Sequence, residues 1–275
     1  MAETKIEWTA FIRPDGTKVP GYTFNPWHGC HKVSPGCKNC YAETLDNRLG
    51  GEEGHWGLHA PRKFFGDKHW NNPLRWDKAA AKLGERHRVF CASVADVFED
   101  RPDLFESRQR LWKLIEQTPN LDWLLLTKRP ENFGKFLPWS DTPWANVWLG
   151  VSAENQEYAD LRLPILIETK AHVRFVSYEP ALELVDFRRW LDLCEKCHVA
   201  EYAEHSMDHG PAVHWLIAGS ESGPGARAGD MAWYADVQKQ CEAHRVKFFM
   251  KQHVEGGKKI SLPVINGKVY DEMPT

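Results

Sequence analysis

The sequence predicts an α/β protein, folded as a partial TIM-like (β/α) barrel with parallel strands. Two observations support this prediction. Short apolar runs alternate with segments of helix length, and the runs are almost continuously apolar, as in parallel strands with both faces covered. The length of 275 residues suits one barrel, and the chain has no internal repeat, so we expect a single domain over residues 1–275.

The first elements are expected to be a hairpin, a strand and a helix. Residues 14–16, Pro-Asp-Gly, lie between two β-prone runs within Ile6–Phe24, which predicts an N-terminal hairpin. The run Tyr22–Asn25 is typical of a strand, and it enters a cysteine-rich loop. The next segment, Tyr41–Leu49, has the composition of a helix.

Further strands alternate with helices in the rest of the chain. The expected strands are Arg88–Ser93, Trp123–Lys128, Val147–Ser152, Val173–Glu179, Trp215–Glu221 and Lys247–Gln252. The expected helices are Pro102–Gln117, Pro130–Phe136, Gln156–Glu168, Phe187–His198 and Ala232–His244. This alternation excludes an all-β sandwich. Residues 181–213, before the sixth barrel strand, are expected to be an insertion.

Polar side chains follow the end of each expected strand, where a β/α barrel carries its chemistry. They are Ser93 and Asp96, Thr127 to Arg129, Ser152, Glu154 and Asn155, Ser177 to Glu179, Ser220 and Glu221, and Lys251 to His253. Helix capping explains some of the Ser and Asp residues. It does not explain charged groups after several apolar strands, so we expect a polar mouth large enough for a ligand.

Three of the seven cysteines, Cys30, Cys37 and Cys40, lie close together in a C-x6-C-x2-C arrangement. In a reducing compartment, clustered cysteines are metal ligands more often than disulfides. Gly29 and Gly36 let the chain fold around a compact object. Three thiolates leave one iron of a four-iron cluster without a protein ligand, and S-adenosylmethionine can bind there through its amino and carboxylate groups.

A closed zinc site is the alternative for this loop. With His28 or His31 as fourth ligand, the three cysteines would form a Cys3His site, and zinc sites often contain C-x2-C pairs. A structural zinc ion is rarely centred on the mouth of a barrel, which favours the iron–sulfur cluster. Three thiols without any metal are the least favoured interpretation.

Motifs spread from Ile6 to Gln252 also resemble those of a known family. They are IEWT, NPWHGC-x6-C-x2-CYAE, LLTKRP, NVWLGVSAENQ, RFVSYEP, GSESGPGAR and FFMKQ. Together they resemble a phage-associated family of radical-SAM-like proteins. The resemblance implies a partial TIM-like barrel, a 4Fe-4S cluster with Cys30, Cys37 and Cys40 as ligands, and S-adenosylmethionine as cofactor. The spacing departs from the C-x3-C-x2-C loop of most radical enzymes.

The resemblance and the strand positions together suggest further roles. The cofactor-side residues are Ser93, Asp96, Lys128, Ser152, Glu154 and Glu221, with Ser93 or Asp96 expected to hold the methionine amino group. The substrate-side candidates for catalysis are Glu179, Arg129, Lys251 and His253. Each of these side chains has an alternative interpretation as a helix cap or a surface ion pair.

A second metal site is predicted within the insertion. Its zinc-ligand candidates, a C-x2-C pair followed by an H-x3-H pair, are Cys194, Cys197, His205 and His209. Free cysteines on a surface helix are the alternative. Cys91 and Cys241 have apolar neighbours and are expected in the core.

Charge and hydropathy limit the function classes. A net charge of −3 and a pI near 6.5 argue against binding nucleic acid through the overall field. No segment has the roughly 20 apolar residues that span a bilayer. The start, MAETKIEW, lacks a signal-peptide core, so we expect a cytoplasmic location, in the host if the chain is phage-encoded.

We therefore expect a radical enzyme that abstracts hydrogen from an organic substrate, leading to rearrangement, epimerisation or a new C–C bond. Isomerase, lyase and transferase types stay open, and the cluster needs an electron donor. The phage association suggests a small molecule such as a nucleotide, or a DNA base, as the substrate. The alternative is a zinc-stabilised module that binds nucleic acid or protein without catalysis.

Overall fold

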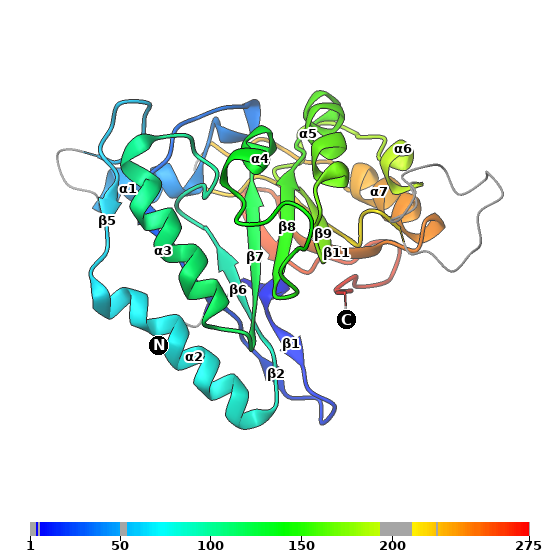
Figure 1. Cartoon of the computed structure of the whole chain (residues 1–275). Coiled ribbons are helices and arrows are strands. Elements are labelled where there is room, and N and C mark those ends of the chain that lie inside the picture. The colour runs from blue at the N-terminus through cyan, green and yellow to red at the C-terminus, as the bar shows by residue number, and fades with distance from the viewer. Residues whose placement is uncertain (1–3, 5, 50–53, 193–210, 224, 275) are drawn as a thin grey trace. The chain divides into compact units, whose positions relative to one another are not determined.

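The computed structural model describes residues 4, 6–49, 54–192, 211–223 and 225–274. The chain forms two compact units, Met1–Trp148 and Leu149–Thr275, which divide within strand β8 (Val147–Ser152). In both units strands alternate along the chain with helices (Figure 1). Since most of the paired strands are parallel, the predicted α/β class is confirmed.

The first unit contains a hairpin and three parallel strands. The hairpin strands are β1 (Phe11–Ile12) and β2 (Lys18–Val19), and the parallel strands are β3 (Tyr22–Thr23), β6 (His87–Cys91) and β7 (Leu121–Thr127). Val89 of β6 pairs with Tyr22 on one side and Trp123 on the other. Nearly all of β7 is buried, which explains its almost continuous apolar sequence. The hairpin confirms the prediction for this segment.

Helices of the first unit lie beside these strands. They are α1 (Tyr41–Leu49), α2 (Asp67–Leu83), α3 (Phe105–Glu116) and α4 (Phe133–Phe136). The unit also has 3-10 turns at Glu7–Thr9, Pro35–Cys37, Pro102–Leu104 and Pro130–Asn132. Two further short strands, β4 (Trp27–His28) and β5 (Lys63–Phe64), pair with each other. The bounds of α1 are those predicted, whereas α2 is absent from the prediction. Helix α2 packs on β6 and β7 (Figure 1).

The second unit has the strand order β12-β11-β10-β9-β8. Its further strands are β9 (Val173–Tyr178), β10 (Trp215–Gly219), β11 (Lys247–Glu255) and β12 (Lys258–Ser261), and its helices are α5 (Gln156–Glu168), α6 (Arg188–Leu191) and α7 (Met231–Ala243). Trp215 of β10 pairs in parallel with Phe175 and with Lys247, while β12 is antiparallel to β11. Helix α7 packs on β10 and β11.

The predicted insertion at 181–213 begins inside the core of this unit. Val185 and Phe187 are buried, and the Ala181 N–H donates to the Gly219 carbonyl at 3.0 Å. Of the expected helix Phe187–His198, the structure shows α6, and the part from residue 193 lies outside the described residues. Among the helices that the structure describes, none is long and apolar enough to cross a membrane.

Candidate functional site

The cysteine loop starts where two backbone segments approach closely. Gly29 has a φ of +118°, and a Cβ there would lie 2.9 Å from Cδ of Arg62 and collide with the carbonyl oxygen of His55. Cys30 then forms a β-bridge with Trp56. A residue without a side chain is therefore required immediately before Cys30.

Cys37 and Cys40 are placed by the two helical turns that follow. Cys37 ends the turn at Pro35–Cys37, and Cys40 directly precedes α1. Burial raises the pKa of the Cys40 thiol, while the N–H groups of Glu43 and Ala42 and the charge of Lys128 act in the opposite direction. All three loop cysteines are half-buried, so the loop presents three thiols with positive groups beside Cys40.

Arg129, which follows β7, faces Cys30. Its Nη1 lies 3.6 Å from the Cys30 Sγ and 2.8 Å from Oδ2 of Asp96, and its Nη2 donates to the His31 carbonyl at 2.9 Å. Burial disfavours the charged guanidinium, but the charges of Asp96 and Glu99 and the contact with Cys30 together outweigh burial and raise the pKa of Arg129. Burial also raises the pKa of Cys30 to about 12, against the charge of Arg129. Arg129 therefore contacts the cysteine loop, and its assignment to the substrate side stays a prediction.

Asp96 holds Arg129 in place. Its Oδ1 accepts from Thr127 Oγ1 at 2.7 Å and from the Phe98 N–H at 3.0 Å. Its Oδ2 accepts from Arg129 and from the Lys128 N–H at 3.2 Å. Four donors fill the acceptor positions of one carboxylate. Asp96 therefore orients Arg129, and the contact of Ser93 or Asp96 with a methionine amino group stays a prediction.

The two candidate zinc histidines of the loop are engaged by carboxylates. His31 Nδ1 lies 2.7 Å from Oε1 of Glu99, and His28 Nε2 lies 2.8 Å from Oδ1 of Asp46. Within the described residues, the one set that brings three metal-ligating atoms within 4.8 Å of one another is His28, Asp46 and His55, and it contains no cysteine. This geometry does not support the predicted alternative of a closed Cys3His zinc site.

Two predicted cofactor-side residues do lie beside the cysteines. The Ser93 Oγ lies 3.1 Å from Nδ2 of Asn25, and the Ser93 carbonyl accepts from the Tyr41 hydroxyl at 2.7 Å. Tyr41 is the first residue of α1 and follows Cys40 directly. The charge of Lys128 acts on the Cys40 thiol. The first unit thus gathers Ser93, Lys128 and the three thiols around one loop.

In the second unit, the predicted substrate-side residues form a cluster. Nζ of Lys251 lies 2.6 Å from Oε1 of Glu179, and each of these side chains is 18% exposed. Burial raises the pKa of Tyr234 to about 12, and the charge of Glu179 adds to this shift. His253 Nδ1 lies 3.4 Å from the Ser220 Oγ, and its ring lies 6.0 Å from that of Tyr234. Sequence reasoning missed Tyr234, because it lies on a helix and not after a strand.

The other acidic candidates of this unit pair with arginines. Glu154 is fully buried, and its Oε2 lies 2.9 Å from Nη1 of Arg162, which also donates to the Ser152 carbonyl at 2.9 Å. Oε2 of Glu221 lies 2.9 Å from Nε of Arg227. The second predicted metal set, Cys194, Cys197, His205 and His209, lies outside the described residues and stays a prediction.

One known protein family matches this chain over nearly its full length. The family profile described as "Protein of unknown function (DUF5131)" matches residues 3–274. The chain belongs to the DUF5131 family. Neither the curated proteins nor the solved structures gave a match to this DUF5131 chain.

Sequence reasoning also missed a buried charge pair behind the loop of this DUF5131 protein. Nη2 of Arg62 lies 2.6 Å from Oε1 of Glu99, and both side chains are fully buried. Arg62 donates to the carbonyls of His55 at 3.0 Å and Gly57 at 3.1 Å, so it fixes the segment that bridges to Cys30. Arg62 and Glu99 are 37 residues apart, and no local pattern reveals such a pair.

Proposed function

We propose that the protein is a radical S-adenosylmethionine enzyme whose 4Fe-4S cluster is held by Cys30, Cys37 and Cys40. The observation that supports this proposal most strongly is the loop itself. It carries three half-buried thiols on one short segment, with the buried guanidinium of Arg129 3.6 Å from the Cys30 sulfur. A charged donor at this distance stabilises a thiolate, which is the form that binds iron.

The three loop sulfurs do not lie close enough together to surround a single zinc ion as they stand. Thiolates around one tetrahedral zinc ion, with Zn–S distances of about 2.3 Å, lie about 3.8 Å apart. The loop sulfurs are not a set in which all lie within 4.8 Å of one another, judged over the described part of the chain. A four-iron cluster takes each thiolate on a different iron and therefore needs a wider spacing.

The chain's own residues would control the charge around such a cluster. When bound, the cluster would supply the electron that cleaves S-adenosylmethionine and starts hydrogen abstraction. Arg129 and Lys128 place positive charge beside Cys30 and Cys40, which offsets the negative charge of the thiolates. Asp96 fixes the orientation of Arg129.

The remaining roles are proposed side chain by side chain. Ser93 and Lys128 stay on the cofactor side because both lie beside the cysteine loop. Ser152, Glu154 and Glu221 stay cofactor-side candidates, and Glu179, Lys251 and His253 stay substrate-side candidates. For Arg129 and Asp96 we propose positioning roles at the cluster. The partial TIM-like barrel and the nucleotide or DNA-base substrate are part of the same proposal.

The test is iron loading of cysteine variants under anaerobic conditions. Wild-type protein reconstituted with iron and sulfide should hold about four iron atoms per chain, appear brown and form 5′-deoxyadenosine from S-adenosylmethionine with a strong reductant. Cys37→Ala should lose the colour and the 5′-deoxyadenosine. Cys241→Ala is the matched control, because Cys241 is buried in α7 and lies outside the loop.

Full iron content in the Cys37→Ala protein would overturn the proposal, since the cluster would then not depend on the loop. Colourless wild-type protein that binds zinc through the loop thiols would also overturn it, in favour of the zinc-stabilised binding module. Loss of iron in both Cys37→Ala and Cys241→Ala would contradict a role specific to the loop.

A further inference from the structure

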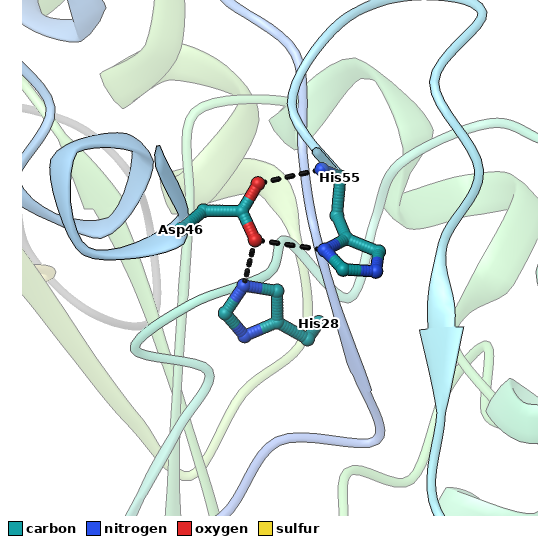
Figure 2. Close-up of side chains that lie close together, drawn as sticks. All are labelled: His28, Asp46 and His55. Atoms are coloured by element: carbon teal, nitrogen blue, oxygen red, sulfur yellow. Dashed lines mark hydrogen bonds and ion pairs between the residues drawn. The ribbon is translucent and has the colours of Figure 1, made fainter. Parts of the chain in front are cut away.

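A second group of metal-ligating side chains lies in the first unit. His28 Nε2 and His55 Nδ1 each lie 2.8 Å from Oδ1 of Asp46, and the ligand atoms all lie within 4.8 Å of one another (Figure 2). The backbone N–H of His55 donates to Oδ2 of Asp46 at 2.5 Å and so fixes the carboxylate. We propose that His28, Asp46 and His55 bind one divalent transition-metal ion of the zinc class.

Asp46 differs from the other buried carboxylates among the described residues. Its side chain is 0% exposed, and its ion-pair partners there are the two histidines. The others each pair with an arginine: Asp96–Arg129, Glu99–Arg62, Asp122–Arg86, Glu154–Arg162 and Glu221–Arg227. A buried negative charge without a permanent cation is costly. A divalent ion supplies that cation and takes both imidazoles as neutral ligands.

The distances accommodate an ion after a small expansion. With metal–nitrogen and metal–oxygen distances of about 2.0–2.2 Å, ligand atoms around a tetrahedral ion lie roughly 3.3 Å apart. The nitrogens lie 2.8 Å from Oδ1, so the ion would replace the two hydrogen-bond protons as each contact lengthens by about half an ångström. The side chains of His28 and His55 are 18% and 14% exposed, which leaves room for water as a further ligand.

The ion would join three segments that frame the cysteines. His28 lies two residues before Cys30, and Asp46 lies in α1, which directly follows Cys40. His55 precedes the residue whose backbone bridges Cys30. Binding would therefore cross-link both ends of the cysteine loop through nitrogen and oxygen ligands, a donor set chemically distinct from the thiols.

The test uses untagged full-length protein with zinc(II) and cobalt(II) as probes. His28→Gln and His55→Asn are the informative variants, because each amide replaces the imidazole N–H that faces Asp46 but is a poor zinc ligand. Wild-type protein should bind one more zinc ion per chain than either variant. Zinc should also raise the Tm of the wild type more than it raises the Tm of either variant. His59 is exposed and lies four residues after His55, so His59→Asn is the control and should bind as much zinc as the wild type.

The absorption spectrum of bound cobalt(II) distinguishes nitrogen and oxygen ligands from thiolate ligands. The difference spectrum of wild type minus His55→Asn should show ligand-field bands without thiolate-to-cobalt charge transfer. Equal zinc content in wild type and both variants, or thiolate charge transfer in the difference spectrum, would refute the proposal. Cys37→Ala should keep the zinc ion of His28, Asp46 and His55, so failure of the cluster proposal leaves this one separately testable.

Discussion

At the scale of single residues, the cysteine loop depends on the buried pair of Arg129 and Asp96. Their side chains are 4% and 8% exposed, and Nη1 lies 2.8 Å from Oδ2. Arg129→Met leaves the Asp96 carboxylate buried without its cation, so we expect the free energy of unfolding to fall by about 3–5 kcal/mol. Adding Asp96→Asn removes that charge and should restore part of the loss. Urea unfolding of metal-free, reduced protein measures all four chains of this cycle.

A surface pair provides the comparison for this cycle. Arg188 and Asp186 also lie 2.8 Å apart, but their side chains are 62% and 53% exposed. Arg188→Met should therefore cost less than about 1 kcal/mol. Equal losses for Arg129→Met and Arg188→Met, or strict additivity of the Arg129 and Asp96 changes, would contradict the role given to the buried pair.

At the scale of elements, helix α2 has a glycine at each end, and the two should respond oppositely to substitution. Gly84 has a φ of +65°, whereas Gly66, at the N-cap, has a φ of −78° and no capping side chain. No atom lies within 4 Å of a Cβ built at either position. Gly84→Ala should therefore cost about 1 kcal/mol through backbone strain alone. Gly66→Ser adds a capping oxygen and should gain a few tenths of a kcal/mol.

Thermal and urea unfolding of the two single variants measure both effects on the same helix. A neutral Gly84→Ala change would mean that this end of α2 does not need left-handed backbone. A loss of stability in Gly66→Ser would mean that the first turn of α2 already has its donors satisfied in another way.

Element bounds were predictable where the signal is local. The bounds of α5 match because Asn155 caps the helix, accepting from the Tyr158 N–H at 3.0 Å. The helix α2 was missed because it begins after Gly66, which has no capping side chain, and because Pro73 removes a hydrogen bond within it. Helix α5 also contains a proline, Pro164, but the cap at Asn155 marks its start. Burial of Trp70 and Trp76 on the core-facing side of α2 compensates for the hydrogen bond lost at Pro73, and this burial depends on strands distant in sequence.

Part of the candidate site is likewise predictable from the sequence, and part of it is not. The C-x6-C-x2-C spacing identifies the three loop cysteines from the sequence alone. The contact of Arg129 with Cys30 joins residues 99 positions apart, and the contact of His28 with Asp46 joins residues 18 apart. Strand position predicts that Arg129 follows β7, but not the direction in which its side chain points. Such contacts are set by packing and have no sequence period.

At the scale of the whole molecule, carboxylates in both units make stability depend on pH. The hydrogen bond from Arg13, with a contribution from His87, lowers the pKa of Glu85 to about 2. The hydrogen bond from Arg188 lowers the pKa of Asp186. In the unfolded chain such groups titrate near pH 4. Below that pH the unfolded state binds more protons than the folded state, so the free energy of unfolding falls on acidification.

The urea midpoint of the wild-type chain should therefore change little between about pH 7 and 5 and fall steeply from about pH 4.5 to 2. Repulsion adds to this fall, because the 35 Lys and Arg residues stay charged while the 38 Asp and Glu side chains are neutralised. Glu85→Gln should be less stable than wild type at neutral pH, since Arg13 and His87 lose a charged partner. Its fall below pH 4 should be shallower, because the group with the lowered pKa is gone. Parallel slopes for the two chains would contradict the lowered pKa of Glu85, and a wild-type midpoint that stays constant down to pH 2 would contradict the whole account.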